Sequence, residues 1–231
     1  TFANHPVISC MGKTITYREL DILSAQFASY LQNHTNLKAG DRIALQMPNI
    51  IQYPVALFGA IRAGLIVVNT NPLYSERELK HQLNDSGAKA LIVLANVAEA
   101  AAAVVPETPV ETVIVTEIAD LHTGFKRPLI NVVVKRVKKM VPDFSFENQI
   151  SYRKALSLGK SGKYTPSSPG AEDVALLQYT GGTTGVSKGA MISHRNLMAN
   201  VLQSKELFES YGLNEATETF LSPLPLYHIY S

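Results

Sequence analysis

The residue types that suggest chemistry are concentrated in one short stretch, YTGGTTGVSKGAMISH, which runs from Tyr179 to His194. Glycines, threonines, a serine and a lysine stand there between two apolar runs. Glycines let backbone N–H groups approach an anion closely, hydroxyl groups add donors, and a lysine adds positive charge. The stretch from 180 to 188, called the threonine-glycine loop below, therefore suits phosphate binding. Its candidate ligands are Thr180, Thr183, Thr184, Ser187 and Lys188.

This loop is not a Walker A loop, whose pattern is G-x-x-x-x-G-K-[ST]. Ser187 instead of glycine precedes Lys188, and Gly189 instead of serine or threonine follows it. A short apolar run, 190–192, also separates the loop from the next helix. These differences disfavour an ordinary P-loop nucleoside triphosphatase. A glycine loop without a ligand is disfavoured too, because turn geometry alone does not explain threonines and a lysine gathered among glycines.

The elements that must position the loop are predicted from hydrophobic periodicity and capping residues. Ser193 is a suitable N-cap for a helix over about 194–208. Capping boxes at Thr16–Glu19 and Ser75–Glu78 open helices that end near Asn33 and Asp85. A further helix is expected over about 53–63, with Gly64 as its C-cap. Strands are expected at 42–46, 65–69, 88–94, 110–115, 172–179 and 190–192.

Strands that alternate with helices of about 10–15 residues are typical of an α/β domain with a largely parallel sheet. The 231 residues are 46% hydrophobic and 17% charged, as in one large globular domain or two small ones. A net charge of +2 is too close to neutral to suggest a nucleic-acid partner. The single cysteine, Cys10, cannot form an internal disulfide, so a reduced, intracellular setting is expected. The longest apolar stretches, such as 53–61, are far below the roughly 18 residues that span a bilayer.

The chain reads as a piece of a longer protein. It begins with Thr1 instead of methionine, and it ends in the apolar run FLSPLPLYHIYS, whereas a terminus is usually exposed and polar. We therefore expect truncation at both ends. GKSGKYTPSSPG, residues 159–170, is a linker-like loop by composition.

Positive charge is concentrated between about Asp120 and Asp143. That segment contains only these two acidic residues and six basic ones: Lys126, Arg127, Lys135, Arg136, Lys138 and Lys139. Its apolar residues fall on one helical face: Leu129, Val133, Val137, Met140 and Val141. The favoured interpretation is a surface helix that packs this stripe on the main domain. The alternative is a basic amphipathic helix, 126–139, that lies on an anionic membrane surface.

The threonine-glycine loop resembles the signature of the adenylate-forming enzymes, a family that includes acyl-CoA synthetases, luciferases and the adenylation domains of peptide synthetases. That signature reads approximately [ST]-[SG]-G-[ST]-T-G-x-x-K-G. The matching positions are Thr180, Gly181, Gly182, Thr183, Thr184, Gly185, Lys188 and Gly189. Ser187 replaces the proline that the family has before the lysine. In the family this loop grips the β- and γ-phosphates of ATP, and the resemblance assigns that role to residues 180–188.

Two further stretches carry the same resemblance. LPLYHI, residues 224–229, is similar to the next family motif downstream, whose aromatic-histidine pair lies beside the acyl-substrate pocket. The resemblance makes Tyr227 and His228 substrate-binding residues, and His228 a catalytic candidate that contacts the carboxylate or the adenylate. By itself, a histidine in an apolar segment is more often a core residue. Residues 47–93 resemble the N-terminal core of the family, and NPLY with HQLNDSGA bring them closest to bacterial long-chain fatty-acyl-CoA synthetases.

The resemblance implies that residues 1–231 are an incomplete N-terminal domain of the adenylate-forming fold, with the C-terminal domain absent. It implies a reaction in which a fatty acid carboxylate attacks the α-phosphate of ATP, giving acyl-AMP and pyrophosphate. Coenzyme A then accepts the acyl group as a thioester. Mg²⁺ is expected to arrive with the nucleotide, because no cluster of carboxylates, histidines or cysteines has metal-ligand spacing. The family's downstream motifs lie beyond the chain, so the chain alone is expected to be inactive.

Two other classes of function stay open. A fatty-acyl-AMP ligase would load a carrier protein in place of coenzyme A. A non-catalytic lipid- or membrane-binding fragment built around 126–139 would leave the threonine-glycine loop unexplained. The expected location is cytoplasmic, with peripheral contact at the inner membrane as a combined alternative. Acyl-chain length and a homodimeric assembly stay open as well.

Overall fold

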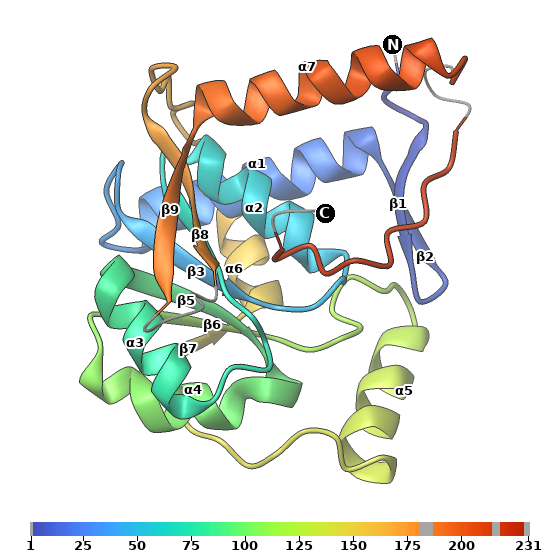
Figure 1. Cartoon of the computed structure of the whole chain (residues 1–231). Coiled ribbons are helices and arrows are strands. Elements are labelled where there is room, and N and C mark those ends of the chain that lie inside the picture. The colour runs from blue at the N-terminus through green and yellow to red at the C-terminus, as the bar shows by residue number, and fades with distance from the viewer. Residues whose placement is uncertain (1, 181–186, 214–217, 229–231) are drawn as a thin grey trace.

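The computed structural model of the chain describes residues 2–180, 187–213 and 218–228 (Figure 1). Helices and strands alternate along these residues. The strands are β1 (Pro6–Cys10), β2 (Lys13–Thr16), β3 (Arg42–Gln46), β4 (Ile66–Asn69), β5 (Ala88–Leu94), β6 (Thr112–Thr116), β7 (Gln149–Ser151), β8 (Val174–Thr180) and β9 (Lys188–Ser193). The α-helices are α1 (Tyr17–His34), α2 (Gln52–Arg62), α3 (Glu76–Ser86), α4 (Ala98–Val104), α5 (Lys126–Val132), α6 (Tyr152–Gly159) and α7 (His194–Ser210). Short 3₁₀ turns, η1 (Ala95–Val97) and η2 (Val105–Glu107), flank α4, and a π-helical turn, η3 (Val133–Val137), continues α5.

The large sheet has the strand order β7-β6-β5-β3-β4-β8-β9 among the described residues. Neighbouring strands are parallel except β8 and β9, which form an antiparallel hairpin. The prediction of an α/β domain with a largely parallel sheet is thus confirmed. The chain enters the sheet at β3, adds β4 on one side and then places β5, β6 and β7 on the other. In sheets of this kind, ligands bind outside the carboxyl ends of the strands.

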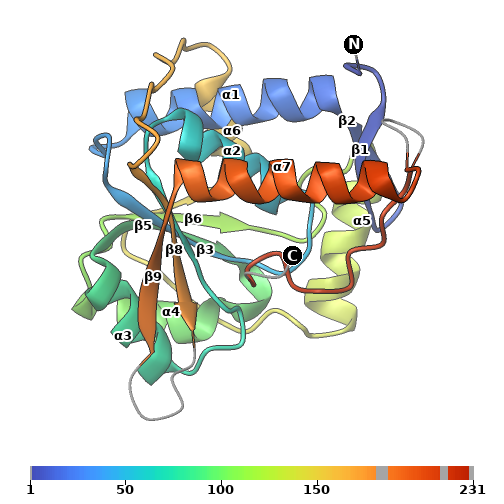
Figure 2. The same cartoon turned by 45° about the horizontal axis from the view of Figure 1, so that its top comes forward.

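Helices cover both faces of the sheet and bury a core on each (Figures 1 and 2). Helices α1, α2 and α6 enclose the larger core, in which Phe27 and Tyr152 are fully buried. Helices α3 and α4 enclose the other core, which contains Leu79 and Leu83. The sheet is therefore buried on both sides, as parallel sheets usually are.

Both predicted capping boxes are present. The side chain of Thr16 accepts a hydrogen bond from the Glu19 N–H at 3.2 Å, and the Glu19 carboxylate accepts one from the Thr16 N–H at 2.8 Å. Ser75 and Glu78 make the same reciprocal pair at the start of α3. Gly87 ends α3 in the left-handed conformation, with a φ of 60°. Local sequence signals thus determine where α1 and α3 begin.

Several short elements were not predicted from the sequence, namely the β1–β2 hairpin, α4, β7 and α6. Helix α6 packs on α1 immediately before the stretch expected to be a linker-like loop. Lys163 and Thr165 of this stretch lie against α1, where the Gln32 amide donates to the Thr165 carbonyl at 3.0 Å and the Asn33 amide donates to the Lys163 carbonyl at 2.9 Å. The contacts that hold this loop join residues more than 100 positions apart, which local patterns do not reveal.

The basic segment does not pack as the favoured interpretation expected. Leu129, Val137 and Met140 are 56%, 72% and 54% exposed, so these three residues of the predicted stripe face outward, whereas Val133 and Val141 are half-buried. The buried residue of α5 is polar: Asn131 accepts a hydrogen bond from the Ala119 N–H at 3.0 Å and donates one to Glu117 at 2.7 Å, both in the segment that follows β6. The π-turn η3, closed by a bond from the Lys138 N–H to the Val133 carbonyl, also rotates the following residues away from ideal helical spacing.

Helix α7 crosses the front of the molecule in Figure 2, below α1 in that view, and none of its residues is buried. Met198, Val201, Leu202 and Leu207 are each more than half exposed. Within the described part of the chain, no helix combines the length and the apolar character needed to cross a membrane.

The contact between α6 and α1 yields a stability prediction. A Cβ on Gly159 would overlap the backbone carbonyl of Gln26, whereas a Cβ on Gly170 would lie at least 3.5 Å from other atoms. Gly159→Ala is therefore expected to lower the free energy of unfolding by about 1–3 kcal/mol, as overpacked cores do. Urea unfolding of the protein that contains this chain measures the change, with Gly170→Ala as the control. Equal stability of the two variants would show that α6 does not pack closely on α1.

Candidate functional site

In the sequence the threonine-glycine loop connects β8 to β9, two strands that lie side by side in Figure 2. Thr180 ends β8, Lys188 begins β9, and the two residues are partners in the antiparallel ladder. Both are exposed, so the hydroxyl of Thr180 and the ammonium group of Lys188 are accessible at the base of the loop. The predicted ligands Gly181, Gly182, Thr183, Thr184 and Gly185 lie outside the described residues.

Tyr179 supports the base of this hairpin. Its ring lies against Gly189, its partner across the ladder, where an added Cβ would come within 2.9 Å of the ring. Its hydroxyl donates a hydrogen bond to the Asp85 carboxylate at 2.6 Å and so ties β8 to α3. Burial and the neighbouring Asp85 carboxylate raise the pKa of Tyr179, so the hydroxyl stays protonated and remains a donor.

Helix α3 makes a second contact with the loop. The Nε2 atom of His81 lies 3.0 Å from the carbonyl oxygen of Ser187. A carbonyl oxygen only accepts hydrogen bonds, so Nε2 carries the proton in this contact. Sequence reasoning assigned no role to His81, because nothing in a sequence shows which turn of a helix meets a loop 106 residues later. The one sequence signal that bears on the position of His81 was the capping box at Ser75, which sets where α3 begins.

The segment 218–228 returns to the carboxyl edge of the sheet, where Asn49 holds it (Figure 1). The Asn49 amide nitrogen donates to the carbonyls of Ser222 at 3.1 Å and Leu224 at 2.8 Å. The Asn49 side-chain oxygen accepts from the N–H of Leu226 at 2.7 Å. Farther along, the amide nitrogen of Gln178 donates to the carbonyl of Tyr227 at 3.1 Å.

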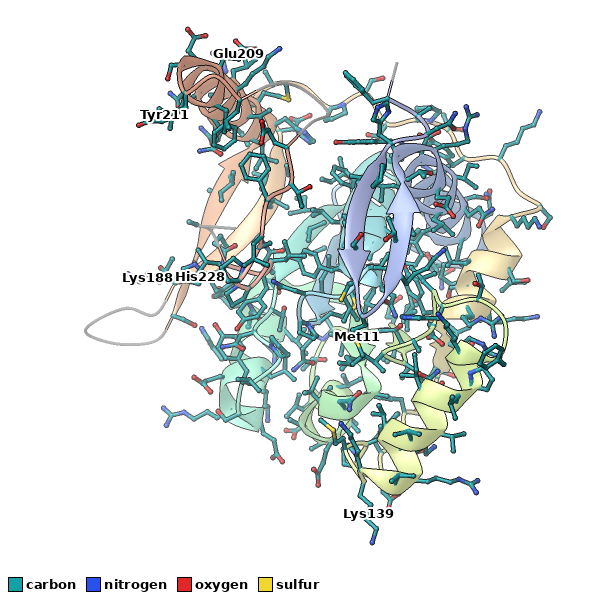
Figure 3. All side chains as sticks on the ribbon, turned by 90° about the vertical axis from the view of Figure 1, so that its right-hand side faces the viewer. Met11, Lys139, Lys188, Glu209, Tyr211 and His228 are labelled. Carbon is teal, nitrogen blue, oxygen red and sulfur yellow. The ribbon has the colours of Figure 1, made fainter. Side chains whose placement is uncertain are left out.

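The predicted acyl-substrate residues therefore lie beside the strand that leads into the threonine-glycine loop. Tyr227 is half-buried against the larger core, and His228 is exposed. Tyr74, from the NPLY stretch, belongs to the same neighbourhood: burial, Glu78 and Tyr227 together raise its pKa. Figure 3 shows Lys188 and His228 on the same side of the molecule, away from Lys139. The structure thus brings together the described residues of three separate sequence motifs.

The described part of the site presents hydroxyl, amide and ammonium groups, which bind anions. Across residues 2–180, 187–213 and 218–228, no group of three or more His, Cys, Asp or Glu side chains is arranged to hold a metal ion.

A parallel α/β sheet with these two segments at its carboxyl edge is the N-terminal part of the adenylate-forming fold. Two solved structures match it. A long-chain-fatty-acid-CoA ligase from Archaeoglobus fulgidus is 29% identical, with a TM-score of 0.71 over 96% of this chain and 38% of that one. MbtA from Mycobacterium smegmatis, in its apo form, is 26% identical, with a TM-score of 0.77 over 100% of this chain and 38% of that one.

The sequence comparison identifies the family. The model of the AMP-binding enzyme family matches residues 1–231, and the chain belongs to that family. A long-chain-fatty-acid–CoA ligase from Salmonella typhimurium is 50% identical over 100% of this chain and 41% of its own length. The corresponding ligase from Escherichia coli O157:H7 is 48% identical over the same shares. The chain thus spans about two-fifths of the length of these curated relatives, and the resemblance found in the sequence is confirmed.

The Tyr179 hydroxyl gives a pH-dependent prediction. Because its pKa is raised in the folded state, its contribution to stability is present below the usual tyrosine pKa of about 10 and is lost as the pH rises through the raised value. Tyr179→Phe is expected to cost about 1 kcal/mol at neutral pH, at the low end for a bond to a charged group because Asp85 is exposed.

Urea unfolding at pH 8 and at pH 10.5 measures both effects. The Tyr179→Phe variant should lose less stability between the two values than the unmodified protein does. Tyr17→Phe is the control, since Tyr17 is 49% exposed. The same alkaline loss in all three proteins would contradict the role given to the Tyr179 hydroxyl.

Proposed function

We propose that the whole protein that contains this chain activates a long-chain fatty acid with ATP and then transfers the acyl group to coenzyme A. The first step forms acyl-AMP and pyrophosphate, and the second forms the thioester and releases AMP. The observation that supports this most directly is the hydrogen bond from Gln178 on β8 to the Tyr227 carbonyl. Gln178 lies two residues before Thr180, where β8 ends. One strand, β8, thus contacts the predicted acyl-substrate pair and also leads into the predicted phosphate-binding loop. The 50% identity to the Salmonella typhimurium ligase supports the choice of substrate.

The first step requires that negative charge be neutralised. A carboxylate and a triphosphate repel each other, so donors that are already positioned must offset the phosphate charge as the bond forms. We assign this role to the threonine-glycine loop, with Mg²⁺ arriving with the nucleotide. The proposed phosphate ligands are Thr180, Gly181, Gly182, Thr183, Thr184, Gly185, Ser187 and Lys188. Tyr227 and His228 are the proposed contacts for the acyl substrate, with His228 at the reacting carboxylate.

The test of this function uses the whole protein with ATP, Mg²⁺ and palmitate, with and without coenzyme A. Release of AMP together with thioester formation, both dependent on coenzyme A, is the expected result. Pyrophosphate release without a thioester would indicate that a carrier protein, and not coenzyme A, accepts the acyl group. No pyrophosphate release would contradict the proposal. The isolated chain, which spans 41% of its relatives' length, is proposed to be inactive, so acyl-CoA synthesis by residues 1–231 alone would contradict that part.

Lys188→Ala tests the loop assignment. Loss of one positioned donor at a reacting anion costs roughly 10²–10³ in rate, so palmitate-dependent pyrophosphate release should fall by about 100-fold. Lys160→Ala is the matched control, because Lys160 is an exposed lysine at the far end of α6. Initial rates at varied ATP concentration give the measurement. Equal rates for the two variants would remove Lys188 from the site.

We also propose that the protein is cytoplasmic and contacts an anionic membrane through residues 126–139. The supporting observation is the outward-facing surface of α5 and η3, where Phe125 and Val137 are 76% and 72% exposed beside basic side chains. Exposed apolar groups next to lysines and arginines are the pattern of helices that lie in a membrane interface. Figure 3 shows Lys139 at the end of this segment, pointing away from the body of the molecule.

Charge removal tests the membrane contact. Each basic residue near an anionic surface contributes about 1 kcal/mol, so the triple variant Lys135→Gln, Lys138→Gln, Lys139→Gln should bind phosphatidylserine-containing vesicles roughly 100-fold more weakly. A matched triple variant, Lys154→Gln, Lys160→Gln, Lys163→Gln, removes the same charge from another exposed surface. Vesicle co-sedimentation measures binding. Equal losses in the two variants would mean that net charge, and not this segment, governs the contact.

A further inference from the structure

We infer that Gln178 and Asn49 are positioning residues that hold Tyr227 and His228 against β8. A chain of buried hydrogen bonds that begins at Tyr53 orients the Gln178 side chain for this task. The inference rests on the proposed function only in that the function gives Tyr227 and His228 their role with the acyl substrate.

The hydrogen-bond chain crosses three elements of the fold. The Tyr53 hydroxyl, on α2, donates to the Asn69 side-chain oxygen at 2.6 Å. The Asn69 amide nitrogen, at the end of β4, donates to the Gln178 side-chain oxygen at 2.9 Å. The Gln178 amide nitrogen, on β8, donates to the Tyr227 carbonyl at 3.1 Å. Tyr53, Asn69 and Gln178 are only 2%, 8% and 5% exposed, so water does not compete for the first two bonds, while the bond to Tyr227 is partly buried.

The direction of the chain is determined by its last acceptor. The Tyr227 carbonyl can only accept, so Gln178 must turn its amide nitrogen toward it and its oxygen toward Asn69. Asn69 must then present nitrogen to Gln178 and oxygen to Tyr53, and the Tyr53 hydroxyl must donate. Neither amide can flip without placing two donors or two acceptors face to face. The Tyr227 carbonyl therefore sets the direction of the chain, and Asn69 and Tyr53 hold the Gln178 side chain in that orientation.

Asn49 secures the approach to the same pair. Its amide nitrogen uses both hydrogens, on the carbonyls of Ser222 and Leu224, and its oxygen accepts from the Leu226 N–H. One side chain thus satisfies three backbone groups of a segment that has no helix or strand of its own. Asn49 lies in the loop that follows β3, next to Pro48, while Gln178 lies on β8, so the two anchors come from different elements of the fold.

Neither anchor is explained by packing alone. Leu226 and Tyr227 pack on the larger core, which provides attraction without direction. Hydrogen bonds to the backbone at Ser222, Leu224, Leu226 and Tyr227 fix how far the segment advances along the edge of the sheet. We therefore expect loss of either amide to leave the segment attached but displaced, and to affect acyl-substrate binding more than ATP binding.

The experiment replaces each amide with a carboxylate of nearly the same shape, in the whole protein. Gln178→Glu and Asn49→Asp remove the donors and place negative charge against backbone carbonyls. Asn33→Asp is the matched control, because the Asn33 amide makes the same kind of bond to the Lys163 carbonyl, away from the site. Tyr53→Phe is a milder variant that removes only the first donor of the chain.

Two readouts are combined. Hydrogen exchange, followed by mass spectrometry, should become at least about tenfold faster at the Leu226 and His228 amides in Gln178→Glu and Asn49→Asp, because displacement of the segment opens the bonds of these amides to Asn49 and Pro225. The KM for palmitate should rise by about tenfold while the KM for ATP changes by less than about twofold. Tyr53→Phe should show the same pattern more weakly, and Asn33→Asp should match the unmodified protein.

Unchanged exchange at these amides in Gln178→Glu and in Asn49→Asp would overturn the inference, whatever the activity. A lower melting temperature with both KM values unchanged would also overturn it, because the two amides would then be structural only. Faster exchange in a protein that never releases pyrophosphate with palmitate would leave the anchoring established and remove the proposed function instead. Tyr53→Phe keeps the inference testable if the carboxylate variants do not fold.

Discussion

The parallel register between β4 and β8 is the constraint on which the described site depends. In that register Asn69 lies opposite Gln178, close enough for their side-chain amides to bond at 2.9 Å. A shift of β8 by one residue would turn the Gln178 side chain to the face of the sheet opposite Asn69 and break the chain from Tyr53 to Tyr227. It would also move Thr180, the first residue of the threonine-glycine loop. The positions of Thr180 and of the proposed acyl-substrate pair, Tyr227 and His228, thus follow from one pairing.

The other contacts that support the site connect the β8–β9 hairpin to helix α3. Helix α3 follows β4 and returns alongside the loop, so that Asp85 bonds Tyr179 and His81 bonds the Ser187 carbonyl. Each contact binds the β8–β9 hairpin to an element that the chain completes about 100 residues earlier. The site is therefore assembled from long-range bonds between preformed, buried elements. Such support would keep the donors of the proposed phosphate-binding site in place.

The starts of helices were predictable from the sequence where a residue forms hydrogen bonds with near neighbours along the chain. The capping boxes at Thr16 and Ser75 begin helices as expected, because the bonded groups are three residues apart. The basic segment shows the limit of the same reasoning. Its apolar spacing indicated a stripe facing the core, but Asn131 makes the inward bonds and a π-turn interrupts the helix. Spacing identifies a face of a helix and does not decide whether the core or the solvent meets it.

The sequence by itself determined the α/β class, the composition of the threonine-glycine loop and the resemblance of its motifs to the adenylate-forming enzymes. These depend on residue types and short spacings, which are visible along the chain. Only the tertiary structure decided that Lys188 pairs with Thr180, that His81 supports the loop, and that Asn49 and Gln178 hold the segment before His228. Those relations join residues up to 177 positions apart, and strand order, register and packing bring them together.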